Sequence, residues 1–507
     1  MDLLVLFAAC LLISGVAIRL GSALAARLGI LDRPGGHKQH EAVTPFAGGF
    51  GLIAVLLSAS LLGDGFFGGA VLAPVPGLIL GAVLIFLTGL ADDIWHLGFK
   101  PRFLVQAMVA LLMVFIGGVE LRSLGELLPG VMVDLGWLAV PVTVFATIGL
   151  INAVNMIDGI DGLSGSVSLF SLALTAIVAH YGDHGAYVFF LVALMGGVAG
   201  FLYFNLRYPG NRRARVFLGD NGSMLLGFLF AWLFIDLSQG EGAAMTPVTA
   251  LWLFALPLMD TVGVMLRRFW LGKSPFRPDR YHFHHLFVRA GFRVCDIVAV
   301  AVLMQLVFAL IGVCGLLLGV PDYLMFWLFL GVFAGYLLVI LRPWRLVPGL
   351  RRLGRWLGLP SVDVCGIFVG YLRREKSPET VALISAGLGN AHDYRLGVYE
   401  MNKCGTDGRN VYVVVQIPAN GDEHLIGRIQ RDALRLKKRL VGHQGVEVRL
   451  FMCRSATSDP SAGVMAGGDR GPDRRDVRSS LIYSVERGHF MVDDGTGCEV
   501  SVPPPCL

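Results

Sequence analysis

Long apolar runs separated by short polar segments fill the first two thirds of the chain. A helix that crosses the roughly 30 Å hydrocarbon core of a bilayer needs about 20 mostly apolar residues. The pattern predicts an all-α, polytopic membrane domain over residues 1–345. Its eleven candidate spans lie near residues 2–20, 45–63, 75–91, 103–120, 136–153, 164–182, 185–205, 216–236, 245–266, 297–318 and 322–342.

The pattern changes in the last third of the chain, where the apolar runs become short. VYVVVQI (Val411–Ile417) and VEVRLFM (Val446–Met452) predict buried strands, and Glu423–Val441 between them predicts a basic amphipathic helix. This β-α-β order predicts a small α/β cytoplasmic domain over residues 361–455. Residues 456–507 are expected to form a linker and a C-terminal tail that is partly flexible.

Composition agrees with a membrane protein, because 55% of the 507 residues are hydrophobic and only 16% are charged. Soluble proteins carry about a quarter charged residues. The first twenty residues have no basic segment before them and no clear small-residue cleavage site after them, so we interpret them as the first span and not as a signal peptide. The eight cysteines include no C-x-x-C pair, which indicates neither a zinc site nor a disulfide framework.

Basic residues are concentrated in every second loop between the predicted spans. Loops 1, 3, 7 and 9 together carry seventeen Lys and Arg, whereas the even-numbered loops hold Arg122 alone and loop 5 has none. By the positive-inside rule, the odd-numbered loops are cytoplasmic and the N-terminus is outside. The C-terminal region follows an odd number of spans, so we expect it to be cytoplasmic too.

The pair Asp92-Asp93 ends the third predicted span in GLADDIWHLGFKPRF. Carboxylates at a helix C-terminus face the negative end of the helix dipole, which is unfavourable by about 0.3 kcal/mol or more each. Adjacent carboxylates can bind a cation or accept a proton from a phosphate, and Lys100 nearby could neutralise a phosphate. A solvated helix end is the alternative interpretation.

A second polar motif, NAVNMIDGIDGLSG (Asn152–Gly165), follows the fifth span. Asn155, Asp158 and Asp161 are spaced by three, which would place them on one side of a helical turn. Turn chemistry is the alternative for the D-G-x-D-G part. It does not explain the two asparagines, since unpaired amides in an apolar helix are costly.

A third motif and a single intramembrane carboxylate lie near cytoplasmic loops. VFLGDNGSMLLG (Val216–Gly227) opens the eighth span, where Asp220 or Ser223 could cap the helix, and the same terminus suits an anion or a metal–phosphate. Asp260 lies inside the ninth span, and an intramembrane carboxylate is a functional candidate by default. Its predicted partner is Arg267 or a residue of loop 5.

Loops 9 and 1 add basic side chains. Clustered histidines in loop 9 suggest zinc, but arginines around them would repel a dication and fit a polyphosphate better. A basic surface that contacts anionic lipid is the alternative. Loop 1 is the less specific of the two and contributes Lys38 and His40. The loop-9 residues are His282, His284, His285, Arg277, Arg280 and Arg289.

Together the five motifs resemble, in order and spacing, those of the polyprenyl-phosphate N-acetylhexosamine-1-phosphate transferase family over about residues 1–345. The resemblance implies that a UDP-N-acetylhexosamine donates its sugar-1-phosphate to undecaprenyl phosphate, with release of UMP and a requirement for Mg²⁺ or Mn²⁺. It also implies a multi-pass protein of the bacterial cytoplasmic (inner) membrane that catalyses the first membrane step of cell-surface polysaccharide synthesis. The expected partners are these substrates and membrane lipid, not nucleic acid, and the expected assembly is a homodimer.

The resemblance further implies roles for individual residues. Asn155 and Asp220 look like metal ligands, Asp92 like the group nearest the lipid phosphate, and Asp161 with Phe217 like the uracil pocket. The catalytic candidates are Asp92, Asp93, Asp158 and Asp161. The substrate-binding candidates are Lys38, His40, Lys100, Asn152, Asp161, Phe217, Arg267, Arg280, His282, His284 and His285.

The histidine loop also distinguishes subfamilies. RPDRYHFHHLFVRAGF resembles the N-acetylglucosamine type and not the His-His-His-Phe pattern of the muramoyl-pentapeptide type. Two residues depart from the family pattern: His37 stands where the first motif usually has an arginine, and His96 where the muramoyl type has a lysine. Another UDP-N-acetyl sugar therefore stays open as the donor. A transporter or flippase of lipid-linked sugars is the alternative from a different class, although its ionisable residues would lie near the middle of the bilayer.

Overall fold

The computed structural model describes residues 2–28, 31–32, 44–66, 76–211, 213–272, 274, 282–290 and 292–356, together with seven strands of the C-terminal region. It divides into two compact units, which we describe separately. The first comprises Met1–Asp32, Thr44–Val288 and Arg293–Arg342, and the second comprises Arg33–Val43, Arg289–Phe292 and Pro343–Leu507.

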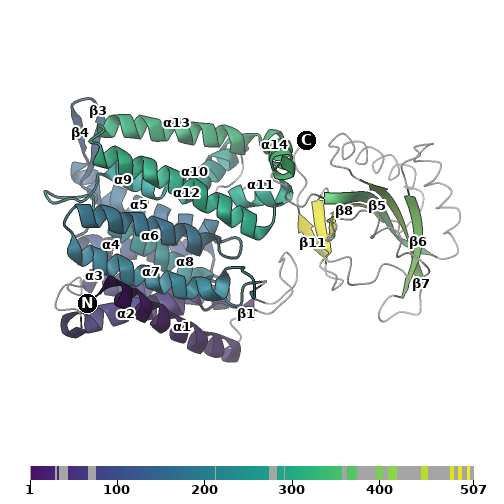
Figure 1. Ribbon diagram of the computed structural model, residues 1–507, viewed down its shortest axis with the longest axis horizontal. Coiled ribbons are helices and arrows are strands. Elements are labelled where there is room, and N and C mark those ends of the chain that lie inside the picture. The colour runs from purple at the N-terminus through teal and green to yellow at the C-terminus, as the bar shows by residue number, and fades with distance from the viewer. Residues whose placement is uncertain are drawn as a thin grey trace. The chain divides into compact units, whose positions relative to one another are not determined.

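The first unit is a bundle of helices that run side by side (Figure 1). Two short antiparallel hairpins join it, β1 (Leu31–Asp32) with β2 (Thr44–Pro45) and β3 (Ser123–Leu128) with β4 (Val131–Asp134). The helices are α1 (Leu3–Leu28), α2 (Gly48–Phe66), α3 (Pro76–Trp95), α4 (Phe99–Phe115), α5 (Ala139–Ile157), α6 (Leu163–Tyr181), α7 (Gly185–Asn205), α8 (Gly219–Asp236), α9 (Pro247–Leu253), α10 (Ala255–Trp270), α11 (Phe283–Ala290), α12 (Val294–Leu317) and α13 (Asp322–Leu341).

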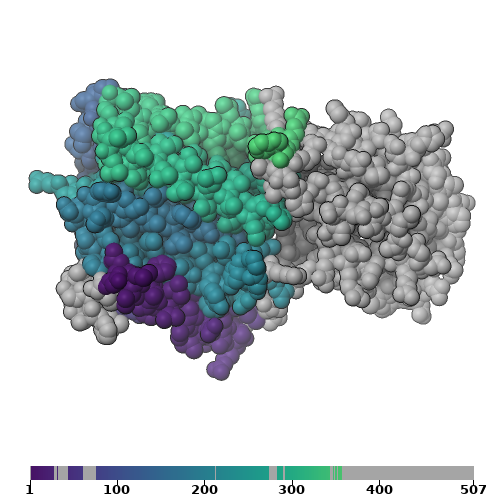
Figure 2. Space-filling view, in the orientation of Figure 1, coloured from purple at the N-terminus to yellow at the C-terminus, as the bar shows by residue number. Residues whose placement is uncertain are grey.

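Among the described residues, 7 helices are long and apolar enough to cross a membrane, or up to 8 if α9 and α10 count as one bent span. This confirms an all-α polytopic membrane protein. The other predicted spans correspond to α2, α4 and α8, which do not meet the same criterion, so the count of eleven stays a prediction. The outer surface carries exposed apolar side chains such as Leu12 (66%) and Leu303 (60%), as contact with lipid requires, and Figure 2 shows one face of it.

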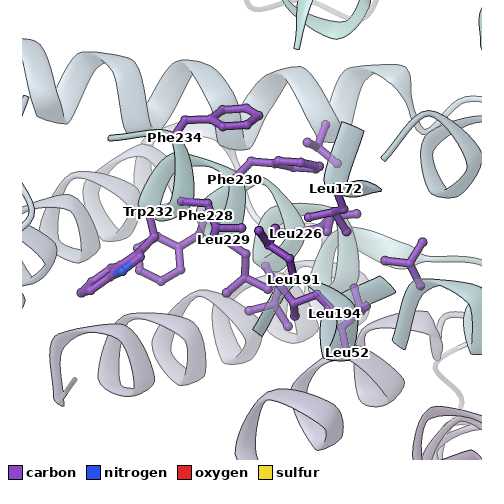
Figure 3. Packing of buried hydrophobic residues seen from close by; sticks show 14 of the residues in the cluster. Leu52, Leu172, Leu191, Leu194, Leu226, Phe228, Leu229, Phe230, Trp232 and Phe234 are labelled. Atoms are coloured by element: carbon purple, nitrogen blue, oxygen red, sulfur yellow. The ribbon is translucent and has the colours of Figure 1, made fainter. Parts of the chain in front are cut away.

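Helix α8 forms the centre of the core because it is apolar on all sides. It packs against α2, α3 and α5, and its residues from Asn221 to Ile235 are all buried. Phe228, Phe230 and Trp232 lie in a cluster with leucines of neighbouring helices (Figure 3). Truncating one buried aromatic side chain of this kind costs about 3–5 kcal/mol. The core therefore fixes where the N-terminus of α8 lies.

A break between α9 and α10 bends the chain by 85°. Pro257 has no N–H to donate to the carbonyl of Leu253. Gln305 of α12 fills this gap, since its Nε2 donates to Leu253 O at 2.8 Å and its Oε1 accepts from Leu256 N at 2.9 Å. Satisfied in this way, a broken helix is tolerated inside a membrane protein. The break sets the direction in which α10 presents Asp260.

The second unit contains α14 (Pro343–Trp356) and an antiparallel sheet in the order β11-β10-β9-β8-β5-β7-β6. The two predicted strands correspond to β7 and β8, and β5 lies antiparallel between them. The predicted helix Glu423–Val441 lies outside the described residues. Three strands come from residues 456–507, where no strand was predicted. The strands are β5 (Val362–Arg373), β6 (Arg395–Asn402), β7 (Arg409–Pro418), β8 (Glu447–Arg454), β9 (Ser480–Ser484), β10 (His489–Asp493) and β11 (Glu499–Val502).

Candidate active site

Four odd-numbered loops meet at the N-terminus of α8. The backbone N–H of Phe217 donates to Pro45 O in loop 1 at 3.0 Å. Asp93, at the end of α3, accepts a hydrogen bond from the backbone N–H of Asp220 at 2.9 Å. Asn155, near the end of α5, donates to the Asp220 carboxylate. Motifs that are far apart in sequence are thus in direct contact.

Among the described residues, even-numbered loops 4, 6 and 8 contact one another through a separate set of residues. The backbone N–H groups of Arg122 and Ser123 both donate to Gln239 Oε1 at 3.0 Å. Gly182 packs against Ala244 so closely that a Cβ on the glycine would lie 2.8 Å from the Ala244 Cβ. These contacts separate the loops into two groups, and the groups match the uneven distribution of basic residues.

Asp93 caps α8. A helix begins with four N–H groups that have no partner inside the helix, and a carboxylate there is favoured by the helix dipole. Besides the Asp220 amide, Asp93 accepts from Asn221 N at 3.1 Å and from Asn221 Nδ2 at 2.5 Å. The preceding residue, Leu218, provides no side-chain cap. Capping by Asp220 or Ser223, which the sequence left open, is replaced by a carboxylate from another helix.

Two glycines permit this close approach. Gly219 has a φ of +73°, a left-handed conformation that favours glycine, and a Cβ there would lie 2.8 Å from Asp93 Oδ2. Gly89 lies one turn before Asp93 on α3, and a Cβ there would collide with the backbone of Asp220 and Asn221. The two helices could not meet with larger residues at these positions.

Arg102 lies at the site, although the sequence alone marks it only as one of the basic residues of loop 3. Its Nη1 lies 2.5 Å from Asp92 Oδ2 and 3.8 Å from Asp220 Oδ1. Helix α4 begins at Phe99, so Lys100 and Arg102 point about 200° apart around it. Lys100, the predicted phosphate contact, is exposed. The arginine instead bridges two of the predicted acidic residues.

The predicted metal ligands Asn155 and Asp220 are in contact. Asn155 Nδ2 also donates to Ser223 Oγ at 2.9 Å, and rotation of the amide by 180° would place its oxygen beside the Asp220 carboxylate. In the described part of the chain, no group of three or more His, Cys, Asp or Glu could hold a metal. Mg²⁺ is usually held by one or two carboxylates together with substrate phosphates and water. The Asn155 amide and the Asp220 carboxylate fit this kind of magnesium site.

Asp158 and Asp161 do not share a helical face with Asn155, because α5 ends at Ile157. Asp158 follows the helix end and accepts a hydrogen bond from the Ser164 hydroxyl. Burial raises the pKa of Asp158 to about 7, the Ser164 hydrogen bond opposes this, and the negative charges of Asp220 and Asp161 add to it. Asp158 is therefore able to exchange a proton near neutral pH.

Two predicted substrate-binding residues already have protein partners. Asn152 donates from Nδ2 to Gln106 Oε1 at 2.8 Å, which links α5 to α4 and satisfies the intramembrane amide. Asp161 accepts from Arg207 Nε at 2.7 Å and from Ala214 N at 3.1 Å. Asp161 thereby holds the segment between α7 and α8 that leads to Phe217. A ligand of the half-buried Phe217 ring would lie next to this segment.

The described histidines of loop 9 lie beside loop 5. A Cβ on Gly159 would collide with the His284 ring, and the His285 ring lies 4.2 Å from that of His284. His284 is 2% exposed, and neither of its ring nitrogens has a hydrogen-bond partner among the described residues. Burial of the ring is the main reason that the pKa of His284 lies well below the usual value for a histidine. His284 is thus a neutral ring with unused polar atoms at the site.

Asp260 pairs with His282, a partner that the sequence did not suggest. Asp260 Oδ2 lies 2.9 Å from His282 Nδ1, and both residues are buried. Arg267 is 4% exposed on α10. Lys38, His40 and Arg280 lie outside the described residues, and so does His37.

Similarity to known proteins identifies the family to which the chain belongs. Residues 75–238 match the family described as Glycosyl transferase family 4. The chain is 35% identical over 337 residues to the undecaprenyl-phosphate alpha-N-acetylglucosaminyl 1-phosphate transferase of Yersinia pestis, which covers 66% of this chain and 90% of that protein. It is 37% identical over 333 residues to the protein of the same name from Haemophilus influenzae, covering 66% and 92%. The chain therefore belongs to the glycosyl transferase family 4 of polyprenyl-phosphate sugar-1-phosphate transferases.

Proposed function

We propose that the protein transfers N-acetylglucosamine-1-phosphate from UDP-N-acetylglucosamine to undecaprenyl phosphate. An oxygen of the lipid phosphate forms a bond to the sugar-bearing phosphorus of the donor, and the bond from that phosphorus to the bridging oxygen breaks. UMP leaves, and the products balance as undecaprenyl-diphospho-N-acetylglucosamine and UMP. The relatives' names specify the same sugar and the same lipid.

The observation that carries this proposal is the contact of Asp92, Arg102, Asn155 and Asp220 at the ends of α3, α4, α5 and α8. Two phosphate anions repel each other, so their meeting requires positive charge at the site. Arg102 provides one such charge, and its guanidinium can also bind a phosphate. Asn221 Oδ1 and Arg102 Nε are buried without partners in the described part of the chain, as expected where a polar ligand completes the site.

Asp220 and Asn155 are proposed to hold Mg²⁺. When bound, the ion would supply charge neutralisation and orient the phosphates. Asp93 keeps these ligands in place because it fixes the first turn of α8. A phosphate with a second pKa near 6 is largely ionised at neutral pH, so the lipid phosphate needs no obligatory base. Asp158 and Asp92 are proposed as acceptors of the remaining proton.

The site is proposed to face the cytoplasm of a bacterium, with the N-terminus outside. This orientation follows from the seventeen basic residues of the odd-numbered loops. It also suits the substrates, since a nucleotide sugar is water-soluble and a polyprenyl tail stays in the bilayer. Their phosphates can meet only at the membrane boundary.

A donor panel tests the proposal directly. The purified protein is incubated with undecaprenyl phosphate, Mg²⁺ and one UDP-sugar at a time, and UMP is measured. We expect release with UDP-N-acetylglucosamine and at least about tenfold less with UDP-glucose, because a site that hydrogen-bonds an N-acetyl group rejects a sugar without it. Preference for another UDP-N-acetyl sugar would change the sugar but not the reaction.

A transporter has one observation in its favour, the break between α9 and α10 that precedes Asp260. Asp260 is satisfied by protein donors, however, and the remaining carboxylates of the site lie at helix ends. Absence of UMP release from every UDP-sugar would favour the transporter.

A further inference from the structure

Asp260 is a buried carboxylate whose contacts reach from the last helix of the first unit to the histidine loop. It is 1% exposed. A carboxylate in such a place is costly unless hydrogen-bond donors surround it. Asp260 has such donors from three different residues, and none of them lies on α10 itself.

The first two donors come from the start of α11. Asp260 Oδ1 accepts from the backbone N–H of Phe283 at 2.8 Å, and Oδ2 contacts His282 Nδ1 at 2.9 Å. The Phe283 amide is one of the donors that a helix N-terminus leaves without an internal partner. A carboxylate on Nδ1 also fixes the tautomer and the orientation of an imidazole. Asp260 thus fixes both the first turn of α11 and the ring of His282.

The third donor is Tyr336 of α13, which belongs to none of the sequence motifs. Its hydroxyl donates to Asp260 Oδ1 at 2.7 Å. Its ring packs on α10 at Gly263, where a Cβ would lie 3.4 Å from Tyr336 Cε1. Tyr336 therefore holds the same carboxylate oxygen that accepts from the Phe283 amide.

The contacts continue from His282 toward the phosphate site. The His282 and His284 rings are stacked, with centroids 6.0 Å apart and planes at 8°. The His284 ring in turn fills the space beside Gly159, one residue after Asp158. A change in the His282 ring plane would therefore displace the neutral His284 ring and its unpartnered nitrogens.

We propose that Tyr336 and Asp260 are positioning residues: Tyr336 orients Asp260, and Asp260 orients His282 and the start of α11 at the active site. The proposal rests on the proposed transferase function. It assigns to α13, through one phenol hydroxyl, a part in aligning residues that bind substrate.

The test uses the purified full-length protein and measures UMP release at varied UDP-N-acetylglucosamine. Tyr336→Phe removes only the hydroxyl, and we expect kcat/KM to fall about fivefold to tenfold while the melting temperature stays within about 2 °C, since one hydrogen bond to a charged group is lost. Asp260→Asn should lower kcat/KM about a hundredfold. Tyr323→Phe, on the same helix but with no hydrogen bond to the site, is the matched control and should equal the wild type.

A double-mutant cycle separates positioning from a general structural effect. In a His282→Ala background, Tyr336→Phe should lower kcat/KM less than twofold further, because its effect passes through His282. An equal loss in both backgrounds, or no loss in the wild-type background, would overturn the proposal. A loss that follows a lowered melting temperature would overturn it too.

Hydrogen exchange gives a readout that does not need turnover. The amides at the start of α11 should exchange faster in Asp260→Asn and Tyr336→Phe than in the wild type, and unchanged exchange would count against the proposal. If the wild type released no UMP from any donor, the transferase function would fail. Exchange in α11 would then decide the positioning proposal alone.

Discussion

The carboxylates of this protein differ in what surrounds them, and the surroundings decide what each can do. Asp93 accepts three hydrogen bonds at the start of α8, so its main effect is to position that helix. Asp92 is paired with Arg102. Asp158 has a single hydroxyl partner in the described part of the chain and a pKa raised to about 7. The charge of Asp158 is therefore expected to change near neutral pH.

This titration predicts how stability depends on pH. The pKa of Asp158 is about 7 in the folded protein and about 3.9 in an unfolded chain. Between these two pKa values, the folded protein holds a proton on Asp158 that the unfolded chain has lost. The stability that protonated Asp158 contributes is therefore fully present below about pH 3.9 and is lost as pH rises through about 7. We expect Asp158→Asn to gain in melting temperature relative to the wild type between about pH 5 and pH 8, measured in detergent without divalent cations.

A control on the surface makes the result specific. Asp134 lies exposed at the end of β4, and Asp134→Asn is the matched variant that removes a surface carboxylate. A constant difference between Asp158→Asn and the wild type across this range would contradict the buried, protonated state of Asp158.

At the scale of helices, the meeting of α3 with the N-terminus of α8 determines the site. Gly89 is the residue that allows it, because any side chain there would collide with the α8 backbone. We expect Gly89→Ala to lower the free energy of unfolding by about 1–3 kcal/mol and to reduce UMP release, as Asp93 and Asp220 separate. Thermal unfolding and the UMP assay measure the two effects.

Gly149 on α5 provides the matched substitution. A Cβ at Gly149 has nothing within 4 Å, so Gly149→Ala should leave stability and activity unchanged or raise stability slightly. If both alanine variants behaved alike, close helix packing at Gly89 would not be the cause.

Much of this arrangement could be predicted from the sequence. The contacts that could not be predicted depend on which helices are neighbours. Apolar periodicity located the helices, and the motifs placed Asn155, Asp220 and the histidines at the site. Periodicity does not say which helices are neighbours. The capping of α8 by Asp93 joins residues 127 apart in the chain, and the Tyr336–Asp260 contact joins residues 76 apart. Such contacts depend on tertiary packing, so no local pattern marked Arg102 or Tyr336.

The positions of helix ends explain the other differences between the predictions and the structure. Asn155 and Asp158 were expected on one helical face, but α5 ends between them. The start of α4 at Phe99 turned Arg102 toward the carboxylates and left Lys100 exposed. The predicted ends differ from the observed ones by about four residues, which is within the roughly 2–4 residue uncertainty of a sequence pattern. At the start of α4, such a shift changes which side chain faces the carboxylates, and the phosphate contact of Lys100 stays a prediction.

For the whole molecule, the separation of the loops into two groups predicts opposite exposure across the membrane. Lys100 and Trp137 are both exposed, Lys100 near the start of α4 beside Arg102 and Trp137 (85%) just after the β3–β4 hairpin of loop 4. In a variant without native cysteines, Trp137→Cys should react with a membrane-impermeant maleimide in intact cells. Lys100→Cys should react only after the membrane is opened. The reverse pattern would contradict the proposed orientation.

The central claim is that Asp220, with Asn155, holds the cation that allows two phosphates to react. The most direct measurement is UMP release from UDP-N-acetylglucosamine and undecaprenyl phosphate by purified Asp220→Ala, beside Asp134→Ala and the wild type. The claim predicts a loss of about a thousandfold or more for Asp220→Ala, at an unchanged yield of folded protein, and normal release by Asp134→Ala. Release by Asp220→Ala at the wild-type rate would contradict it.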